Sequence, residues 1–227
     1  MTELHWRAAT DTGSYDGTAL ISVGQGAVHL RTDLPAGTLE NAVATLSWPM
    51  AENEKIFMHG QAHMIFILHG HGSGRQRGTD HIPKFLLDKY AFDRYGDYHF
   101  VRYSKRKGMS HGFSYCYFRS GNRFRLAASL DERPGYTIFR YDSAKSLLTL
   151  ERDCAGVCHG GSVFAAFDLF FAEGSEDEVF DAWFAALGCR PRTTKKLAGY
   201  SSWYNRYQNI DEASILEDLQ GSRALFK

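Results

Sequence analysis

Short hydrophobic segments separated by turns fill most of this chain, and their spacing is the feature that most restricts its fold. Between about residues 15 and 172 these segments recur at intervals of roughly 8–15 residues. They are TALISVGQGAVHL (18–30), NAVATLSWP (41–49), YHFVRYS (98–104), GFSYCYFRS (112–120), RFRLAASL (123–130), GYTIFRYD (135–142), SLLTLERD (146–153) and VFAAFDLFFA (163–172). Turn residues such as SGN and DERPG separate them, as in antiparallel hairpins. About ten strands pack more readily as two sheets than as one, so the pattern predicts an all-β domain, a large antiparallel β-sandwich.

Composition and charge exclude several classes of protein. Aromatic residues make up 14% of the chain, which suits a β-rich core. Lys+Arg and Asp+Glu number 26 each, so no net positive field predicts binding to nucleic acid. No apolar run reaches the ~18 residues of a membrane span, and the N-terminus lacks a signal-peptide pattern. We therefore expect a cytoplasmic protein with free cysteines, and Cys154-x-x-x-Cys158-His159 without a second ligand pair predicts no zinc site.

Helical spacing replaces the hairpin pattern at residue 175. Ser175 is a suitable N-cap with Glu178 three residues later, and Gly188 stands where a C-cap glycine belongs. Apolar residues between them recur with helical period, which predicts a helix over 176–187 that docks on the sandwich. Earlier in the chain, residues 81–97 are compatible with a short helix or with a long aromatic loop.

The last part of the chain has a different pattern again. Residues 190–196 form a basic linker, 197–204 (LAGYSSWY) predict a strand, and Asp211 is a suitable cap for a following helix. A strand and a helix joined by a short loop are half of a β/α unit. Because a lone unit cannot bury its apolar side chains, we expect Ile215, Leu216 and Leu219 to stay exposed or to find a makeshift surface.

Four stretches together resemble the α-galactosidases of glycoside hydrolase family 36. They are EKIFMHG (54–60), YGDYHFVRY (95–103), SLDERPGYTIF (129–139) and GYSSWYNRYQNIDEASILEDL (199–219). The resemblance implies a β-sandwich of the supersandwich type (1–174), a linker helix with a basic linker (175–197) and the first β/α unit of a truncated (β/α)8 catalytic barrel (198–227). It also implies a retaining hydrolase acting on terminal α-galactosides such as melibiose or raffinose, without a cofactor.

The resemblance places catalysis outside this chain. In the family, the nucleophilic Asp and the acid/base Asp come from the fourth and sixth barrel strands, which match no residues here. We therefore assign no catalytic residue in the chain and expect it to be inactive alone. Trp203, at the end of the first barrel strand, corresponds to part of the galactose-binding wall; a Trp filling the barrel interior or an interdomain seam is the alternative. Tyr204 and Asn205 are further candidates for substrate binding.

One stretch departs from the family pattern. Where relatives carry Trp and Tyr after the position of His59-Gly60, this chain has His63, His69 and His71. His69 and His71 on one strand face would form a usable pair of metal ligands, but no third ligand is evident, and a solvated His/Gly loop explains the stretch equally well. No metal is predicted.

Three functions remain at this point. The first is the incomplete α-galactosidase, with a galactoside as the partner of the full-length enzyme and a homo-oligomer through the β-sandwich left open. The second is a non-catalytic sugar-binding or structural β-sandwich module, and the third is a metal-binding protein built on the histidines. The stretch 199–219 favours the first, since a self-contained module has no use for it.

Overall fold

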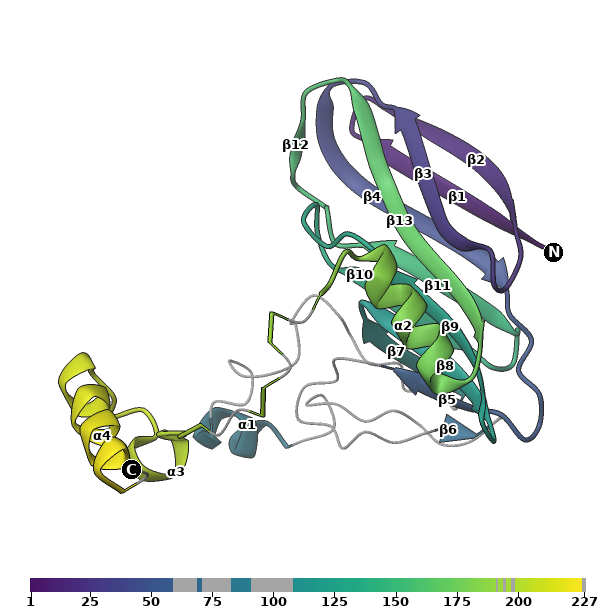
Figure 1. Ribbon diagram of the computed structural model, residues 1–227. Coiled ribbons are helices and arrows are strands. Elements are labelled where there is room, and N and C mark those ends of the chain that lie inside the picture. Colours follow the sequence, from purple (N-terminus) through teal and green to yellow (C-terminus); the bar gives the residue numbers. More distant parts are fainter. Residues whose placement is uncertain are drawn as a thin grey trace. The chain divides into compact units, whose positions relative to one another are not determined.

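The protein is described by a computed structural model over residues 1–58, 69–70, 83–90, 108–190, 192–193, 195–196 and 199–225. The chain consists of two compact units, Met1–Cys189 and Arg190–Lys227. Strands dominate the first unit, whereas the regular structure described in the second is helical (Figure 1). We call them the sandwich unit and the C-terminal unit.

Two antiparallel sheets form the sandwich unit. The first sheet has the order β2-β1-β4-β11-β10-β7, with the short β12 paired to β4. Its strands are β1 (Thr2–Thr10), β2 (Gly13–Ile21), β4 (Gly37–Ser47), β7 (Met109–Phe113), β10 (Thr137–Asp142), β11 (Leu147–Arg152) and β12 (Cys158–His159). The pairs are all antiparallel, as expected from hairpin spacing.

The second sheet has the order β3-β13-β9-β8-β5-β6. Its strands are β3 (Gly26–Asp33), β5 (Lys55–Met58), β6 (His69–Gly70), β8 (Tyr115–Ser120), β9 (Arg123–Ser129) and β13 (Val163–Gly174). All of its pairs are antiparallel too. The prediction of a β-rich, antiparallel, two-sheet domain is confirmed.

Alternating side chains from the two sheets fill the space between them. In β1, Leu4, Trp6 and Ala8 are buried while the residues between them are exposed, which is the period-2 pattern of a half-buried strand. The centre of this core is aromatic: the ring centroids of Trp48 and Phe118 lie 5.7 Å apart. The Tyr141 hydroxyl donates a hydrogen bond to the Trp48 carbonyl at 2.9 Å, so its buried polar group is satisfied.

The structure corrects the sequence analysis near the N-terminus. The sandwich begins at Thr2 and not near residue 15, because β1 pairs with both β2 and β4. The segment 18–30 contains parts of two strands. It turns between β2 and β3, where Gly24 and Gly26 adopt positive φ angles of 95° and 86° that favour glycine. The two halves thereby join different sheets.

The predicted helix over 176–187 is confirmed as α2 (Glu176–Ala186). The Glu178 carboxylate accepts hydrogen bonds from the backbone N–H and the hydroxyl of Ser175, both at 2.8 Å, and these bonds lower its pKa. At the other end, Gly188 has φ +68° and its N–H donates to the Ala185 carbonyl at 3.0 Å, which ends the helix.

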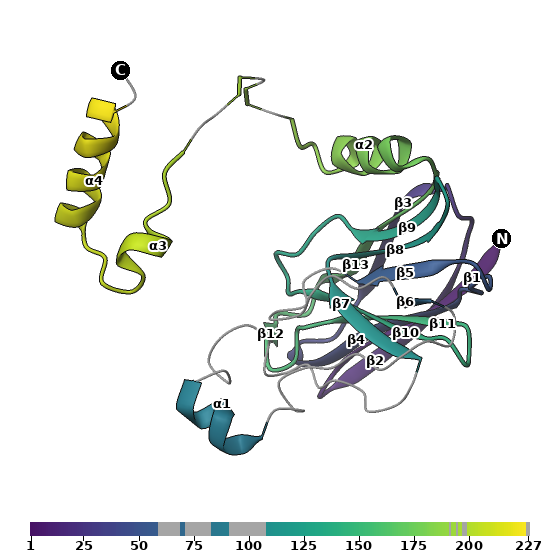
Figure 2. The same ribbon diagram turned by 90° about the horizontal axis from the view of Figure 1, so that it is seen from below.

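Helix α2 packs on the outer face of the second sheet (Figure 2). Its Val179 and Trp183 are buried among Phe124, Leu126 and Phe170 of β9 and β13. The Trp183 indole N–H donates to the Ser129 carbonyl at 3.1 Å. Apolar contact and one directed bond therefore hold α2 against the sandwich, as predicted.

Within the stretch 81–97, residues Lys84–Tyr90 form the short helix α1. This is the first of the two alternatives left open by the sequence. The segment 98–104, predicted as a strand, lies outside the described residues.

Candidate functional site

Trp203 and Tyr204, the predicted substrate-binding residues, lie on the one-turn helix α3 (Trp203–Arg206). The predicted strand over 197–204 is therefore wrong for its described residues. The N–H groups of Arg206 and Tyr207 donate to the carbonyls of Ser202 and Trp203, at 2.7 and 3.1 Å. A parallel barrel strand needs hydrogen-bonded neighbours, and none is described for this segment, so local helical bonds satisfy its backbone instead.

The predicted second helix is present as α4 (Glu212–Leu225). Asp211 caps it, because its carboxylate accepts from the Ser214 N–H at 2.8 Å while the Ser214 hydroxyl accepts from the Asp211 N–H at 3.0 Å. The bond from the Ser214 N–H is the main cause that lowers the pKa of Asp211. The expected capping role of Asp211 is confirmed.

Arg206 connects α3 to α4. Its guanidinium donates to both carboxylate oxygens of Asp218, at 2.8 and 3.2 Å, and to Glu217 at 3.0 Å. Tyr200 donates its hydroxyl to Asp218 at 3.1 Å. The hydrogen bond from Arg206 is the main cause that lowers the pKa of Asp218. The sequence analysis missed this cluster, since an Arg and an Asp twelve positions apart follow no recognisable spacing.

The aromatic side chains of the C-terminal unit remain open to solvent. The exposed fraction is 58% for Trp203 and 96% for Tyr204, and the ring of Trp203 packs edge-on against Tyr207 with 4.6 Å between centroids. Tyr207 itself has φ +48°, which brings the chain around between the two helices. The ring of Trp203 is thus held by Tyr207 and is open to solvent. A ring of this kind can contact the apolar face of a sugar. Within the part of the chain that the structure describes, Tyr204 packs against no other ring, and its side chain is open to solvent.

The apolar residues of α4 are exposed as well. No residue of α4 is buried, and the exposed apolar side chains include Ile215, Leu216 and Leu219. Of the two expected outcomes, exposure or cover by a makeshift surface, the structure shows exposure.

The histidine stretch yields no described metal site. The backbone of His69 lies on β6, opposite Ile56 of β5. The side chain of His69 is not described, and His59, His63 and His71 lie outside the described residues. Within the described part of the chain, no three metal-ligating side chains come together. Cys154 is buried, and burial raises the pKa of its thiol to about 11, so this thiol stays protonated, whereas Cys158 is exposed.

The carboxylates of the motif 129–139 have structural partners. Asp131 accepts two hydrogen bonds from the Arg133 side chain, which lower its pKa to about 2, whereas burial raises the pKa of Glu132. Buried Arg152 donates to the carbonyls of Asp131 and Gly135, at 2.7 and 2.8 Å. At Gly135 (φ +141°), a Cβ would lie 1.9 Å from the Asp153 carbonyl. These contacts fix the connection between β9 and β10.

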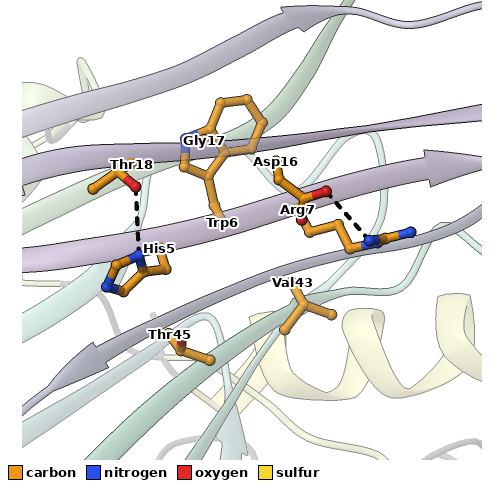
Figure 3. A pocket seen from close by; sticks show the side chains of 8 residues that line it. All are labelled: His5, Trp6, Arg7, Asp16, Gly17, Thr18, Val43 and Thr45. Atoms are coloured by element: carbon orange, nitrogen blue, oxygen red, sulfur yellow. Dashed lines mark hydrogen bonds and ion pairs between the residues drawn. The ribbon is translucent and has the colours of Figure 1, made fainter.

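A shallow hollow of about 410 Å³ lies on the outer face of the first sheet (Figure 3). Its polar side chains satisfy one another: Arg7 pairs with Asp16 at 3.3 Å, and the Thr18 hydroxyl lies 3.4 Å from the His5 ring nitrogen. Trp6 borders the hollow but is only 6% exposed, so it offers no aromatic platform for a sugar. The hollow does not support the alternative of a sugar-binding sandwich.

Comparison with known proteins gave limited similarity. No protein-family model and no curated protein matches the chain. Among solved structures, the chain is similar to the α-galactosidase TtGalA from Thermus thermophilus in complex with stachyose, with 18% identity and a TM-score of 0.42 over 87% of this chain and 41% of that one. For the complex with p-nitrophenyl α-D-galactopyranoside the identity is 21%, the TM-score 0.40 and the coverage 87% and 39%.

This chain therefore spans about two fifths of the length of the solved chains that it matches. The strand pairing defines the two-sheet architecture of the sandwich unit. No helix in the described part of the chain is long and apolar enough to cross a membrane.

Proposed function

We propose that this chain is the N-terminal part of a retaining α-galactosidase of glycoside hydrolase family 36, acting on terminal α-galactosides such as melibiose and raffinose. The observation that carries the proposal is the order of its parts. A β-sandwich is followed by the docked helix α2, a basic segment and then a separate unit that contains the most family-specific stretch, 199–219. This order corresponds to the family plan of sandwich, linker helix and barrel.

In this proposal the C-terminal unit is the beginning of the catalytic barrel. Residues 199–204 take up the strand conformation only when neighbouring barrel strands satisfy their backbone groups. The exposed apolar residues of α4 are then covered by the following parts of the barrel. Trp203 contributes its ring to the wall of the galactose site, because active-site residues of such barrels come from strand ends and the loops that follow them.

In this proposal the catalytic pair of carboxylates lies outside residues 1–227. Retaining hydrolysis needs two carboxyl groups about 5–5.5 Å apart, one to attack the anomeric carbon and one to protonate the leaving oxygen and then to activate water. In the family both lie on later barrel strands. Among the sandwich carboxylates, Asp131 is held by Arg133, and Glu132 accepts the Thr137 N–H at 2.6 Å. We therefore assign a structural role to both.

The test compares two proteins in an assay with an aryl α-galactoside. Residues 1–227 alone are expected to give no turnover above a heat-treated control. The chain extended through the reading frame that follows Lys227 is expected to hydrolyse the substrate and to lose activity when either of two barrel Asp residues is changed to Asn. Turnover by residues 1–227, or an extension without such a pair of Asp residues, would contradict the proposal.

A second measurement on the extended enzyme tests Trp203. Trp203→Ala is expected to raise KM about tenfold, and Trp203→Phe to restore most of the affinity, because the ring face supplies the contact. Tyr136→Ala, which removes an exposed aromatic from the sandwich unit, is the matched control and leaves KM unchanged. An unchanged KM for Trp203→Ala would place this residue outside the sugar site.

A further inference from the structure

Strands β2 and β3 each stand at one end of a sheet, and they differ in how that edge is protected. Among the described strands, β2 pairs only with β1 and β3 only with β13. The edge strand β3 carries exposed His29, Arg31 and Asp33, and its register with β13 shifts between Ala165 and Phe167. Charges and bulges of this kind discourage pairing with another chain.

The edge strand β2 has no bulge and only one charged residue. Its register with β1 is unbroken over nine residue pairs, from Thr10↔Gly13 to Thr2↔Ile21. The sequence GSYDGTALI contains neither Lys nor Pro, and its single charged residue, Asp16, is already paired with Arg7. Leu20 is 67% exposed on this strand. A long, regular and nearly uncharged edge is a surface suited to pairing with a further strand.

The hairpin determines which backbone groups of β2 face away from β1. Because only residues 11 and 12 separate the paired Thr10 and Gly13, this closing pair is a hydrogen-bonded one. Hydrogen-bonded and non-hydrogen-bonded pairs alternate along an antiparallel ladder. The N–H and C=O groups of Ser14, Asp16, Thr18 and Leu20 therefore point outward and are available to a second strand.

The sequence of β2 is complementary to itself in one register. Nine residues that pair over their full length with a second β2 place the two-fold axis at Gly17, the middle residue. Asp16 then faces Thr18 of the second copy, Ser14 faces Leu20, and Tyr15 faces Ala19. The outward backbone groups meet in this register, and the two Asp16 carboxylates do not face each other. Centring the pair on Asp16 would oppose two like charges, which is unfavourable.

We propose that two copies of this chain pair through β2, antiparallel and centred on Gly17, so that their first sheets join into one continuous sheet. Tyr15 is 41% exposed and its ring lies 4.9 Å from Trp6, so pairing extends the cover over this side of the core. This inference depends on the sandwich unit and is independent of the galactosidase proposal.

The test measures the dimer dissociation constant of residues 1–227 by sedimentation equilibrium. The unaltered chain is expected to dimerise. Thr18→Asp places a second carboxylate opposite Asp16 of the other copy, at two places in each dimer. It is expected to raise the dimer dissociation constant about tenfold or more. Thr18→Asn has nearly the same shape without the charge and is expected to leave the constant within about threefold. Thr18→Lys faces Asp16 with an opposite charge and is expected to retain the dimer.

Thr45→Asp controls for a general effect of charge on this face. Thr45 and Thr18 both lie beside His5, but β4 is an inner strand and its backbone is already paired on both sides (Figure 3). This variant is expected to dimerise like the unaltered chain. A monomeric unaltered chain, or a dimer that Thr18→Asp does not weaken, would overturn the proposal. Equal losses with Thr18→Lys and Thr18→Asp would overturn the register centred on Gly17.

Discussion

The four tryptophans divide between the two units of the chain and show how differently each unit is held together. Trp6, Trp48 and Trp183 of the sandwich unit are at most 7% exposed, whereas Trp203 of the C-terminal unit is 58% exposed. The first three are covered by strands that come from distant parts of the sequence. Among the described residues, the ring of Trp203 has only Tyr207, four residues away, as a partner. Long-range burial therefore stabilises the sandwich unit, and local bonds order the C-terminal unit.

Polar contacts follow the same division. In the sandwich unit, Arg125 is largely buried, binds Glu54 at 2.6 Å and lies over the rings of Trp48 and Phe118. In the C-terminal unit, the ion pairs of Arg206 with Glu217 and Asp218 join two neighbouring helices near the surface. Exposed pairs of the latter kind contribute little to global stability, because water and salt screen them.

Removing a core aromatic should show the largest difference between the units. Phe118→Ala deletes a fully buried ring that contacts Trp48 and Tyr141, and we expect a loss of about 3–5 kcal/mol in the free energy of unfolding. Leu219→Ala, at a 60% exposed position of α4, should leave the main transition unchanged. Urea unfolding followed by tryptophan fluorescence measures both. Equal losses would contradict the division of the chain.

Acid should destabilise the sandwich unit through His111. Burial, and after it the charge of Arg140, lower the pKa of His111 to about 4 from its ordinary value near 6.5. The folded state therefore keeps His111 neutral while the unfolded state binds a proton. The free energy of unfolding therefore has its full value above pH 6.5. It decreases by roughly 3 kcal/mol as the pH drops from 6.5 to 4.

Denaturant unfolding at several pH values tests this expectation. His111→Gln should flatten the slope of stability against pH between 4 and 6.5. His5→Gln, at an exposed position of the same sheet, should leave the slope as it is. A slope that persists in His111→Gln would assign the acid sensitivity to other groups.

A substitution that weakens the contact of α2 with the sandwich should have an effect of intermediate size on the stability of this unit. Trp183→Phe keeps most of the apolar packing but removes the N–H that satisfies the Ser129 carbonyl, so we expect a loss of about 1–2 kcal/mol. Phe184→Leu, at the neighbouring position that is 44% exposed, keeps every hydrogen bond of the helix and is the control; it should lower the unfolding midpoint by less than Trp183→Phe. A neutral Trp183→Phe would mean that packing alone docks the helix.

The smallest effect on the sandwich should come from Arg206→Ala. This substitution removes the bonds to Glu217 and Asp218 that connect α3 with α4. We expect a lower helical signal in circular dichroism and an unchanged midpoint for the main unfolding transition. A shift of that midpoint would show that the two units are coupled.

Sequence reasoning succeeded where local patterns determine the structure. Alternation and turn residues predicted the antiparallel sheets, and the cap at Ser175 with Gly188 predicted α2. It failed where partners are distant. The pairing of β1 with β4 follows from no local signal, and neither does the contact of Arg206 with Asp218. The strand predicted at 197–204 failed because its apolar and aromatic residues suit a strand only beside neighbouring strands.

Native-state hydrogen exchange of residues 1–227 tests the division of the chain most directly. Amide groups of the inner strands β4 and β11 should exchange only through global unfolding, because both of their edges are paired. Those of α3 and α4 should exchange through local opening, orders of magnitude faster and independently of Phe118→Ala. Protection of residues 199–225 equal to that of β4, in a chain whose sandwich is intact, would contradict the account.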